Sequence, residues 1–352
     1  MKTFDLFFVP ADDRPVSSEP IRECLADIPH LHQDASDPSR RQYHNPESGA
    51  IFYLLVAPEH LPEPPATGYE DDELDEDFED EPEDGLEDSD GDDYDDDDDD
   101  DDVDVPSIDT PPLTVNIPLF HPSFLAREAL EVVRTFQERA GLRVIDPQDG
   151  GVGDGEPGAY GDDDLLESWK RTHGPIYAKI SSPENIHRWS TEDSDRYAAY
   201  CRHRARLEEE LADDDIDVPR LFAARHEGAT KSLCIWRSDR PVALPRCDLV
   251  LVERVSTRRG LLRRRRVDEL VVRGDELWRI LAPFSDTRHH PVPHLVLRRA
   301  DPPPAQLAND LEDLVGEPVD AARRTELAGV VDFDIPPAEE PASADAEETT
   351  GD

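Results

Sequence analysis

Residues 50–57 read Ala-Ile-Phe-Tyr-Leu-Leu-Val-Ala, and residues 113–119 read Leu-Thr-Val-Asn-Ile-Pro-Leu. Both runs are apolar and rich in β-branched or aromatic residues, which is typical of buried strands. Between them, the segment from Glu70 to Asp104 holds 26 Asp or Glu and no Lys or Arg, and it includes eight consecutive Asp at 95–102. The sequence therefore predicts two strands that belong together and flank a long acidic insertion.

The elements on either side of these strands repeat one pattern. Thr3 to Val9 is an apolar run that predicts a strand, and residues 19–28 have the apolar spacing of a short helix. After the insertion, Ser123 to Ala140 carries one apolar stripe of a helix, and Leu142 to Ile145 reads as a strand. The order β-α-β, insertion, β-α-β is that of the ferredoxin-like, split βαβ fold. The competing interpretation is a generic mixed α/β domain.

The acidic insertion, with bounds 61–109, is predicted to be disordered. Its like charges repel one another, and it holds too little apolar surface to offset the entropy cost of ordering. A hairpin loop tolerates such an insertion, because each doubling of a flexible loop costs only about 0.6 kcal/mol. We therefore expect one N-terminal domain, residues 1–60 plus 110–148, that is interrupted by this loop.

The chain changes character at a Gly-rich stretch, residues 149–162, which predicts a flexible linker. Residues 163–335 then read as helical at first and as a mixed α+β region afterwards. The expected helices span 164–172, 183–211, 275–281 and 304–315, and the expected strands span 220–224, 231–237, 248–255, 270–272, 294–298 and 330–333. The acidic residues 336–352 predict a disordered tail. The predicted fold class is therefore α+β.

The composition restricts the partners that the protein can have. The formal charge of −47 keeps the chain soluble and repels nucleic acid and anionic membranes at long range. The same charge favours a basic protein partner, and the acidic tract should collect divalent cations weakly and without specificity. No apolar run is long enough for a membrane span, and the four Cys have no CxxC spacing. We therefore expect a cytoplasmic protein.

The sequence predicts neither a cofactor nor a specific metal site. The stretch Gly153-Asp-Gly-Glu-Pro-Gly158 has dinucleotide-binding spacing, but no helix begins at its glycines as the fingerprint requires. The acidic tract lacks an EF-hand pattern, because Gly91 would place Leu86 at the first ligand position. The histidines at 289, 290 and 294 have no Cys nearby and read as loop residues.

Carboxylates at the predicted strand ends are the candidates for catalysis. Asp12, Asp13 and Arg14 follow the first strand, and Asp146 follows the fourth. Sites gather at strand ends in α/β folds, and paired carboxylates can do acid/base work. The alternative is that Asp12 and Asp13 stabilise the turn and pair with Arg14, in which case the protein has no catalytic residue here.

One stretch of this acidic chain is strongly basic. Arg254 to Arg266 holds seven Arg and no acidic residue, and Gly260 indicates a hairpin tip. Such a loop could bind phosphate backbones, although no aromatic residue is present for base stacking. The acidic tract, tethered in the same chain, could mask it. The alternative is a solvated basic loop. The candidate binding residues are Arg258, Arg259, Arg263, Arg264, Arg265 and Arg266.

Several phrases together resemble a family of uncharacterised bacterial proteins. They are Asp5-Leu-Phe-Phe-Val-Pro10, Asn45-Pro-Glu-Ser-Gly49, Phe120-His-Pro-Ser-Phe-Leu-Ala-Arg127, Leu142-Arg-Val-Ile-Asp-Pro-Gln148 and Val242-Ala-Leu-Pro-Arg-Cys-Asp-Leu-Val250. The resemblance covers residues 1–60 and 110–260 and implies no activity, cofactor or site residue. The acidic insertion is particular to this chain, which implies that the core function does not depend on it.

These observations favour a soluble, non-enzymatic protein-interaction module that binds a basic protein partner. Two alternatives stay open. The first is an enzyme with a carboxylate site near Asp12, Asp13, Arg14 and Asp146. The second is a polyanion or nucleic-acid binder that uses the basic loop from Arg254 to Arg266.

Overall fold

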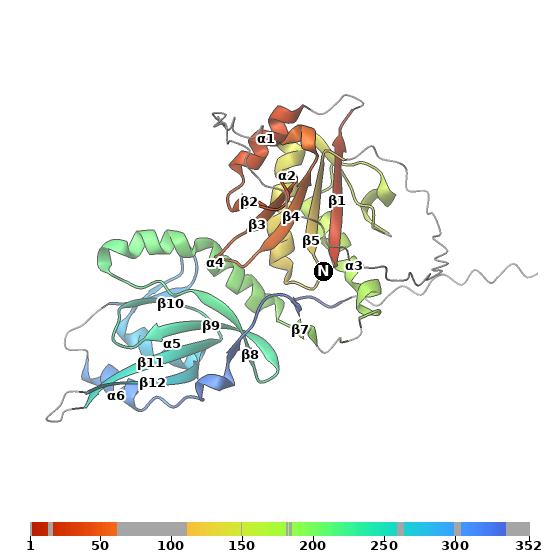
Figure 1. Ribbon diagram of the computed structural model, residues 1–352. Helices are drawn as coiled ribbons and strands as arrows, with labels where there is room; N and C mark the ends of the chain where they lie inside the picture. Colours follow the sequence, from red (N-terminus) through yellow and green to blue (C-terminus); the bar gives the residue numbers. More distant parts are fainter. Residues whose placement is uncertain are drawn as a thin grey trace, which may run out of the picture.

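The chain forms two lobes, each built around a β-sheet, in the computed structural model of Figure 1. The fold is mixed α+β, as predicted. The structure describes residues 2–12, 17–61, 111–148, 150–180, 182, 185–258, 264–298 and 304–335. The predicted acidic insertion lies outside these residues from position 62 onward, and so does the predicted acidic tail, residues 336–352.

The first lobe contains a six-stranded sheet in which all neighbouring strands are antiparallel. In order across the sheet, the strands are β2 (Leu31–Gln33), β3 (Arg40–His44), β4 (Ile51–Val56), β5 (Leu113–Pro118), β1 (Thr3–Pro10) and β6 (Leu142–Ile145). The strands that flank the acidic insertion, β4 and β5, are direct neighbours, with Leu54 opposite Val115. The prediction that these two strands belong together is confirmed.

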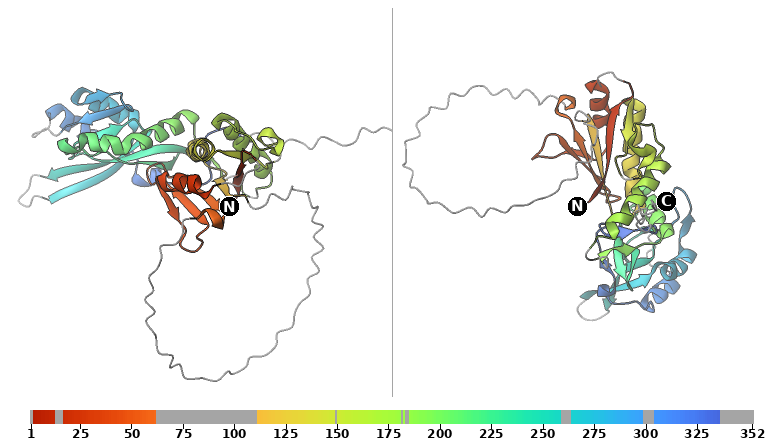
Figure 2. Two further views of the ribbon diagram at one scale, coloured as in Figure 1. Left: turned by 90° about the horizontal axis from the view of Figure 1, so that it is seen from above. Right: turned by 90° about the vertical axis from the view of Figure 1, so that its right-hand side faces the viewer.

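One face of this sheet is covered by helices, which Figure 2 shows in its right-hand view. Phe4, Leu6 and Phe8 alternate along β1 and are fully buried, because successive side chains of a strand point to opposite faces. The covering helices are α1 (Ser18–Asp27) and α2 (Ser123–Arg139), which contact each other. The ring of Phe8 lies 5.8 Å from that of Phe136 in α2.

The helix α3 (Asp162–Tyr177) also packs in the first lobe, against α2, although the predicted boundaries placed it in the region 163–335 after the linker. The indole of Trp169 is fully buried, and its Nε1 donates to the carbonyl of Pro118 at 3.3 Å. The Gly-rich stretch before α3 is not a free linker. It forms the short helix η2 (Val152–Gly155), and Gly158 pairs with Val144 at the edge of the sheet.

His173 of α3 is buried between two backbone groups. Its Nε2 accepts a hydrogen bond from the N–H of Phe120 at 2.9 Å, so Nδ1 carries the proton and donates to the carbonyl of Trp169 at 2.8 Å. Burial lowers the pKa of His173 from 6.5 to about 4. The neutral imidazole is therefore part of the native hydrogen-bond pattern near neutral pH.

We expect His173 to make the protein less stable in mild acid. Between pH 6.5 and 4 the unfolded chain binds a proton on His173 that the folded chain does not bind, so stability falls as the pH falls. The loss should total about 3 kcal/mol, at about 1.4 kcal/mol per pH unit. Urea unfolding over this pH range should show a shallower slope in a His173→Gln variant. Equal slopes would mean that folding does not lower the pKa of His173.

The second lobe contains a five-stranded and a three-stranded sheet (Figure 1). In the larger sheet β11 runs parallel to β9, and the other neighbours are antiparallel. Its strands, in order, are β12 (Arg264–Arg273), β11 (Leu249–Arg258), β9 (Ala229–Arg237), β8 (Leu221–His226) and β15 (Arg323–Arg324). The smaller sheet has the order β10 (Val242–Pro245), β14 (His294–Leu297) and β13 (Asp286–Arg288), and the lobe also holds α5 (Gly274–Leu281) and α6 (Ala305–Glu312).

The long helix α4 (Thr191–Leu211) contacts α2 of the first lobe and both β8 and β9 of the second. The segment 327–335, which we call the returning segment, leads back from the second lobe. Its strand β16 (Val330–Val331) pairs with β7 (His187–Arg188), and the N–H of Gly329 donates to the carbonyl of Phe120 at 2.8 Å. Among the described residues, none of the helices combines the length and the apolar character that crossing a membrane demands.

Candidate functional site

Asp146, a predicted catalytic candidate, is fully buried directly after β6. Its carboxylate accepts hydrogen bonds from the N–H groups of Gln148 at 3.1 Å and Val152 at 3.0 Å, and from the hydroxyl of Ser168 at 2.5 Å. All three donors are uncharged and belong to the turn after β6 or to α3. Asp146 therefore holds this turn against α3 and has no open position for a substrate.

The structure does not bring Asp146 and Asp12 together. Because β6 is antiparallel to β1, Ile145 lies opposite Phe7 and Leu142 lies opposite Pro10. Asp146 thus lies beside the middle of β1, about 14 Å from the strand end at Pro10, at about 3.4 Å per residue, and Asp12 follows beyond that end. The prediction that the two carboxylates lie close together is therefore wrong, because the antiparallel strands β1 and β6 end at opposite ends of the sheet. Asp13 and Arg14 lie outside the described residues.

A pocket of about 380 Å³ opens in the first lobe beside α2. It lies between the end of α1, strand β3 and α4. Its apolar wall is formed by Ile28, Pro29, Phe124, Val132 and Ala198. Its polar lining is formed by Asp27, Tyr43, Asn45, Ser48, Glu128, Glu131, Thr135, Arg139 and Arg202. The pocket therefore combines an apolar wall with a group of carboxylates, and we call it the Glu128 pocket.

The carboxylate of Glu128 is held by three uncharged donors. The hydroxyl of Tyr43 donates to Oε1 at 2.8 Å, and the amide of Asn45 donates to the same oxygen. The hydroxyl of Ser48 donates to Oε2 at 2.7 Å. No Lys, Arg or His of the described chain forms an ion pair with Glu128. The negative charge is therefore positioned by hydrogen bonds but is not neutralised.

The loop Asn45-Pro-Glu-Ser-Gly49 positions two of these donors. The side-chain oxygen of Asn45 accepts from the N–H of Glu47 at 3.0 Å, which is the local turn that Asn favours. Gly49 closes the loop with φ of +76°, and a Cβ at this position would lie 3.1 Å from Leu327 of the returning segment. The loop geometry therefore requires this spacing of Asn and Gly, and it places Ser48 under Glu128.

Tyr43 remains a hydrogen-bond donor over the whole physiological pH range. The pKa of the Tyr43 phenol is raised well above its ordinary value of 10, mainly by burial of the side chain and secondly by the nearby charge of Glu128. The ring stacks on Phe52 with centroids 4.4 Å apart, which fixes its orientation. The donor set of the Glu128 pocket is therefore rigid and stays protonated.

Two arginines lie at the edge of the pocket. The Nη2 of Arg139 lies 2.7 Å from Oδ2 of Asp27, so these two charges pair with each other. Arg202 of α4 is exposed. Glu131, one helical turn from Glu128, adds a second carboxylate to the lining. The arrangement can bind a cationic group, but it shows no nucleophile beside a general base.

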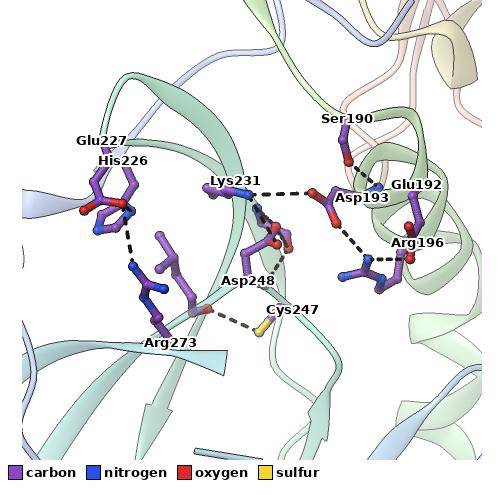
Figure 3. A network of polar contacts seen from close by, with 12 residues as sticks. Ser190, Glu192, Asp193, Arg196, His226, Glu227, Lys231, Cys247, Asp248 and Arg273 are labelled. Atoms are coloured by element: carbon purple, nitrogen blue, oxygen red, sulfur yellow. Dashed lines mark hydrogen bonds and ion pairs between the residues drawn. The ribbon is translucent and has the colours of Figure 1, made fainter. Parts of the chain in front are cut away.

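A second polar network lies between α4 and the second lobe (Figure 3). Lys231 lies between two carboxylates, with its Nζ at 3.7 Å from Asp193 and 3.8 Å from Asp248. Asp248 also accepts from the N–H and the hydroxyl of Ser232 at 2.8 and 2.7 Å. Every charge in this group has a partner of opposite sign, so we assign it a structural role in joining α4 to the sheet.

His226, Glu227 and Glu317 bring three ligand-type atoms within 4.8 Å of one another among the described residues. His226 Nε2 lies 3.1 Å from Glu317, and a guanidinium nitrogen of Arg273 lies 3.8 Å from Glu227. The Arg273 cation competes for the position that a metal ion would need. The contacts read as a hydrogen bond from His226 to Glu317 and an ion pair of Glu227 with Arg273, so they do not support a metal site.

The basic loop is described only in part. Arg258 is the last residue of β11, and Arg264, Arg265 and Arg266 begin β12, but the structure describes only the backbone of these four. Arg259 and Arg263 lie outside the described residues. The predicted hairpin is confirmed by the antiparallel pairing of β11 with β12.

The sequence contained signals for the Glu128 pocket that our prediction did not use. Glu128 lies four residues after Phe124 and four before Val132, both buried, so a carboxylate interrupts the apolar stripe of α2. Asn45 followed by Pro predicts a turn. What the sequence alone could not show is that this turn and this helix face each other. The chain matches no family model, no curated protein and no solved structure.

Proposed function

We propose that the protein is a non-enzymatic interaction module for a basic protein partner, and that the Glu128 pocket receives an arginine or lysine side chain of that partner. The observation that carries the proposal is the carboxylate of Glu128, which has no ion-pair partner among the described residues and is held by three uncharged donors in a partly enclosed position. A charged hydrogen bond to a cation is about twice as strong as one between neutral groups.

The shape of the pocket favours a long basic side chain over a small metal ion. Ile28, Phe124 and Val132 offer an apolar wall to the methylene stem of a Lys or Arg. The carboxylates of Glu128 and Glu131 are available to its charged end. The formal charge of −47 would further raise the association rate of a basic partner.

The alternative of an enzyme finds less support. Of its proposed carboxylates, Asp12 follows the end of β1 whereas Asp146 lies beside the middle of that strand, and Asp146 is buried under three donors.

The proposal also includes the fold of the first lobe and the cellular location of the protein. We propose a ferredoxin-like first lobe, supported by the antiparallel order β4-β5-β1-β6 with α1 and α2 as the connecting helices, and extended by β2 and β3. We also propose a cytoplasmic protein with a disordered acidic insertion, related to the uncharacterised bacterial proteins that share its sequence phrases. The charge pattern and the four buried, unpaired cysteines support this setting.

A Glu128→Gln variant tests the pocket because it removes the charge and keeps the shape. The probe is acetyl-Gly-Arg-Gly-amide, whose single charge limits binding to the acidic tract, followed by ligand-observed NMR titration. We expect the variant to bind about tenfold more weakly, or about 1.4 kcal/mol. The matched control is Glu138→Gln, an exposed position on the same helix. Equal affinities in the two variants would contradict the proposal.

A further inference from the structure

The strands β11 and β12 extend beyond the sheet to which they belong. They pair from Leu249 opposite Arg273 to Arg258 opposite Arg264, whereas β9 accompanies β11 only as far as Glu253. Residues 254–258 and 264–268 therefore form a two-stranded ribbon, which projects from the second lobe in Figures 1 and 2. We call this part the arginine ribbon.

The pairing register sorts the arginines of the ribbon by face. Ser256 lies opposite Arg266 and Arg258 lies opposite Arg264, and alternate residues of a strand share a face. Arg258, Arg264 and Arg266 therefore belong to one face of the ribbon. Arg265, opposite Thr257, belongs to the other face.

One further arginine anchors the base of this face. Arg254 belongs to the same face, and its Nη1 donates to the carbonyl of Glu312 at the end of α6 at 2.9 Å. Its Nη2 also lies 3.9 Å from Asp268. Arg254 thus contacts the end of α6, and the backbone register places Arg258, Arg264 and Arg266 farther along the same face of the ribbon.

The acidity of the chain does not extend to the second lobe. Residues 216–335 contain 20 Lys or Arg and 19 Asp or Glu, a net charge of +1 within a chain of −47. At physiological salt, charges more than about 8 Å away are largely screened. The whole-chain charge, which argued against nucleic acid at the sequence level, is therefore a weak argument at the ribbon.

We propose that the arginine ribbon binds duplex nucleic acid, with Arg258, Arg264 and Arg266 contacting the phosphate backbone. A two-stranded β-ribbon fits the major groove of B-DNA, and the planar guanidinium binds phosphate with two parallel hydrogen bonds. The ribbon carries no aromatic residue, so stacking on single-stranded bases is not favoured. An acidic peptide is the competing ligand, but it offers no groove for a ribbon to enter.

The test uses the full-length chain and a fluorescein-labelled 20-base-pair DNA duplex, followed by anisotropy between 50 and 200 mM salt. We expect a triple variant, Arg258→Ser, Arg264→Ser and Arg266→Ser, to bind at least about tenfold more weakly at 50 mM salt. The slope of log affinity against log salt should fall by about 2.7, which corresponds to three lost phosphate contacts. Single Arg264→Ser should weaken binding more than Arg265→Ser on the opposite face.

A second triple variant controls for the loss of charge. Arg143, Arg171 and Arg279 are exposed, and replacing each with Ser removes the same charge elsewhere. The proposal fails if both triple variants lose equal affinity, or if the full-length chain does not bind the duplex at 50 mM salt. It also fails if a peptide of residues 70–104 binds the ribbon more tightly than the duplex does. The single variants keep the test valid if a triple variant does not fold.

Discussion

Replacing Glu47 with alanine should lower the free energy of unfolding by about 4 kcal/mol, because it removes the main carboxylate partner of the buried Arg204 guanidinium. The Glu47 carboxylate receives two hydrogen bonds from Arg204, at 2.5 Å from Nε and at 3.0 Å from Nη2. The Arg204 side chain is only 8% exposed, and Nη1 also donates to the carbonyl of Val218 at 3.1 Å. Without Glu47, most of the guanidinium stays buried beside a single, exposed carboxylate, that of Glu208.

A matched control exists on the same helix. Arg206 and Glu210 form an ion pair at 2.7 Å, but their side chains are 60% and 42% exposed. Removing Glu210 should cost less than about 0.5 kcal/mol, as exposed pairs usually do. Urea unfolding of the two alanine variants at pH 7 measures the difference. If Glu47→Ala costs no more than Glu210→Ala, the Glu47–Arg204 pair does not stabilise the contact between the loop 45–49 and α4.

Removing the carboxylate of Asp332 should have an effect of similar size, about 3–4 kcal/mol. Asp332 is 3% exposed, and it accepts from the N–H of Ser123 at 2.7 Å, from the Ser123 hydroxyl at 2.9 Å and from the Ser194 hydroxyl at 2.7 Å. The Ser123 N–H lies at the first turn of α2, where the helix dipole favours a negative charge. In Asp332→Ala these donors lose a charged acceptor inside the protein, and each unsatisfied donor costs about 1–3 kcal/mol.

The neighbouring carboxylate of Asp334 provides the comparison. It pairs with Arg188, but its side chain is 95% exposed. Asp334→Ala should therefore change the free energy of unfolding by less than about 1 kcal/mol. Chemical unfolding of both variants, monitored by tryptophan fluorescence, compares a buried carboxylate with an exposed one on the same segment. Similar losses in the two variants would overturn the role assigned to Asp332.

The long elements could be predicted from the sequence because each carries its own periodic signal. The expected strand from Thr3 to Val9 and the expected helix from Ser123 to Ala140 correspond to β1 and α2 within one residue at each end. The short strands β10, β13 and β15 were not predicted. Runs of two to four residues hold no period of their own, and their pairing depends on distant partners such as β14 and β8.

The candidate site was harder to predict than the fold. Asp12 and Asp146 were expected to meet because both follow a strand, but the direction of a strand is set by pairing and not by local sequence. The Glu128 pocket joins α2 to a turn more than 80 residues earlier in the chain, with Asn45 and Glu128 separated by 83 positions. Such a contact is specified by the packed sheet and has no local pattern.

The returning segment also affects how long the folded state persists. Ser123 and Asp332 are separated by 209 positions, so their contact closes a very long loop. Contacts of this kind usually form late in folding, because the entropy of loop closure must be overcome first. Contacts that are absent from the transition state influence the unfolding rate and leave the folding rate almost unchanged. We therefore expect the contacts of the returning segment to slow unfolding, so that they determine how long the two lobes stay folded together.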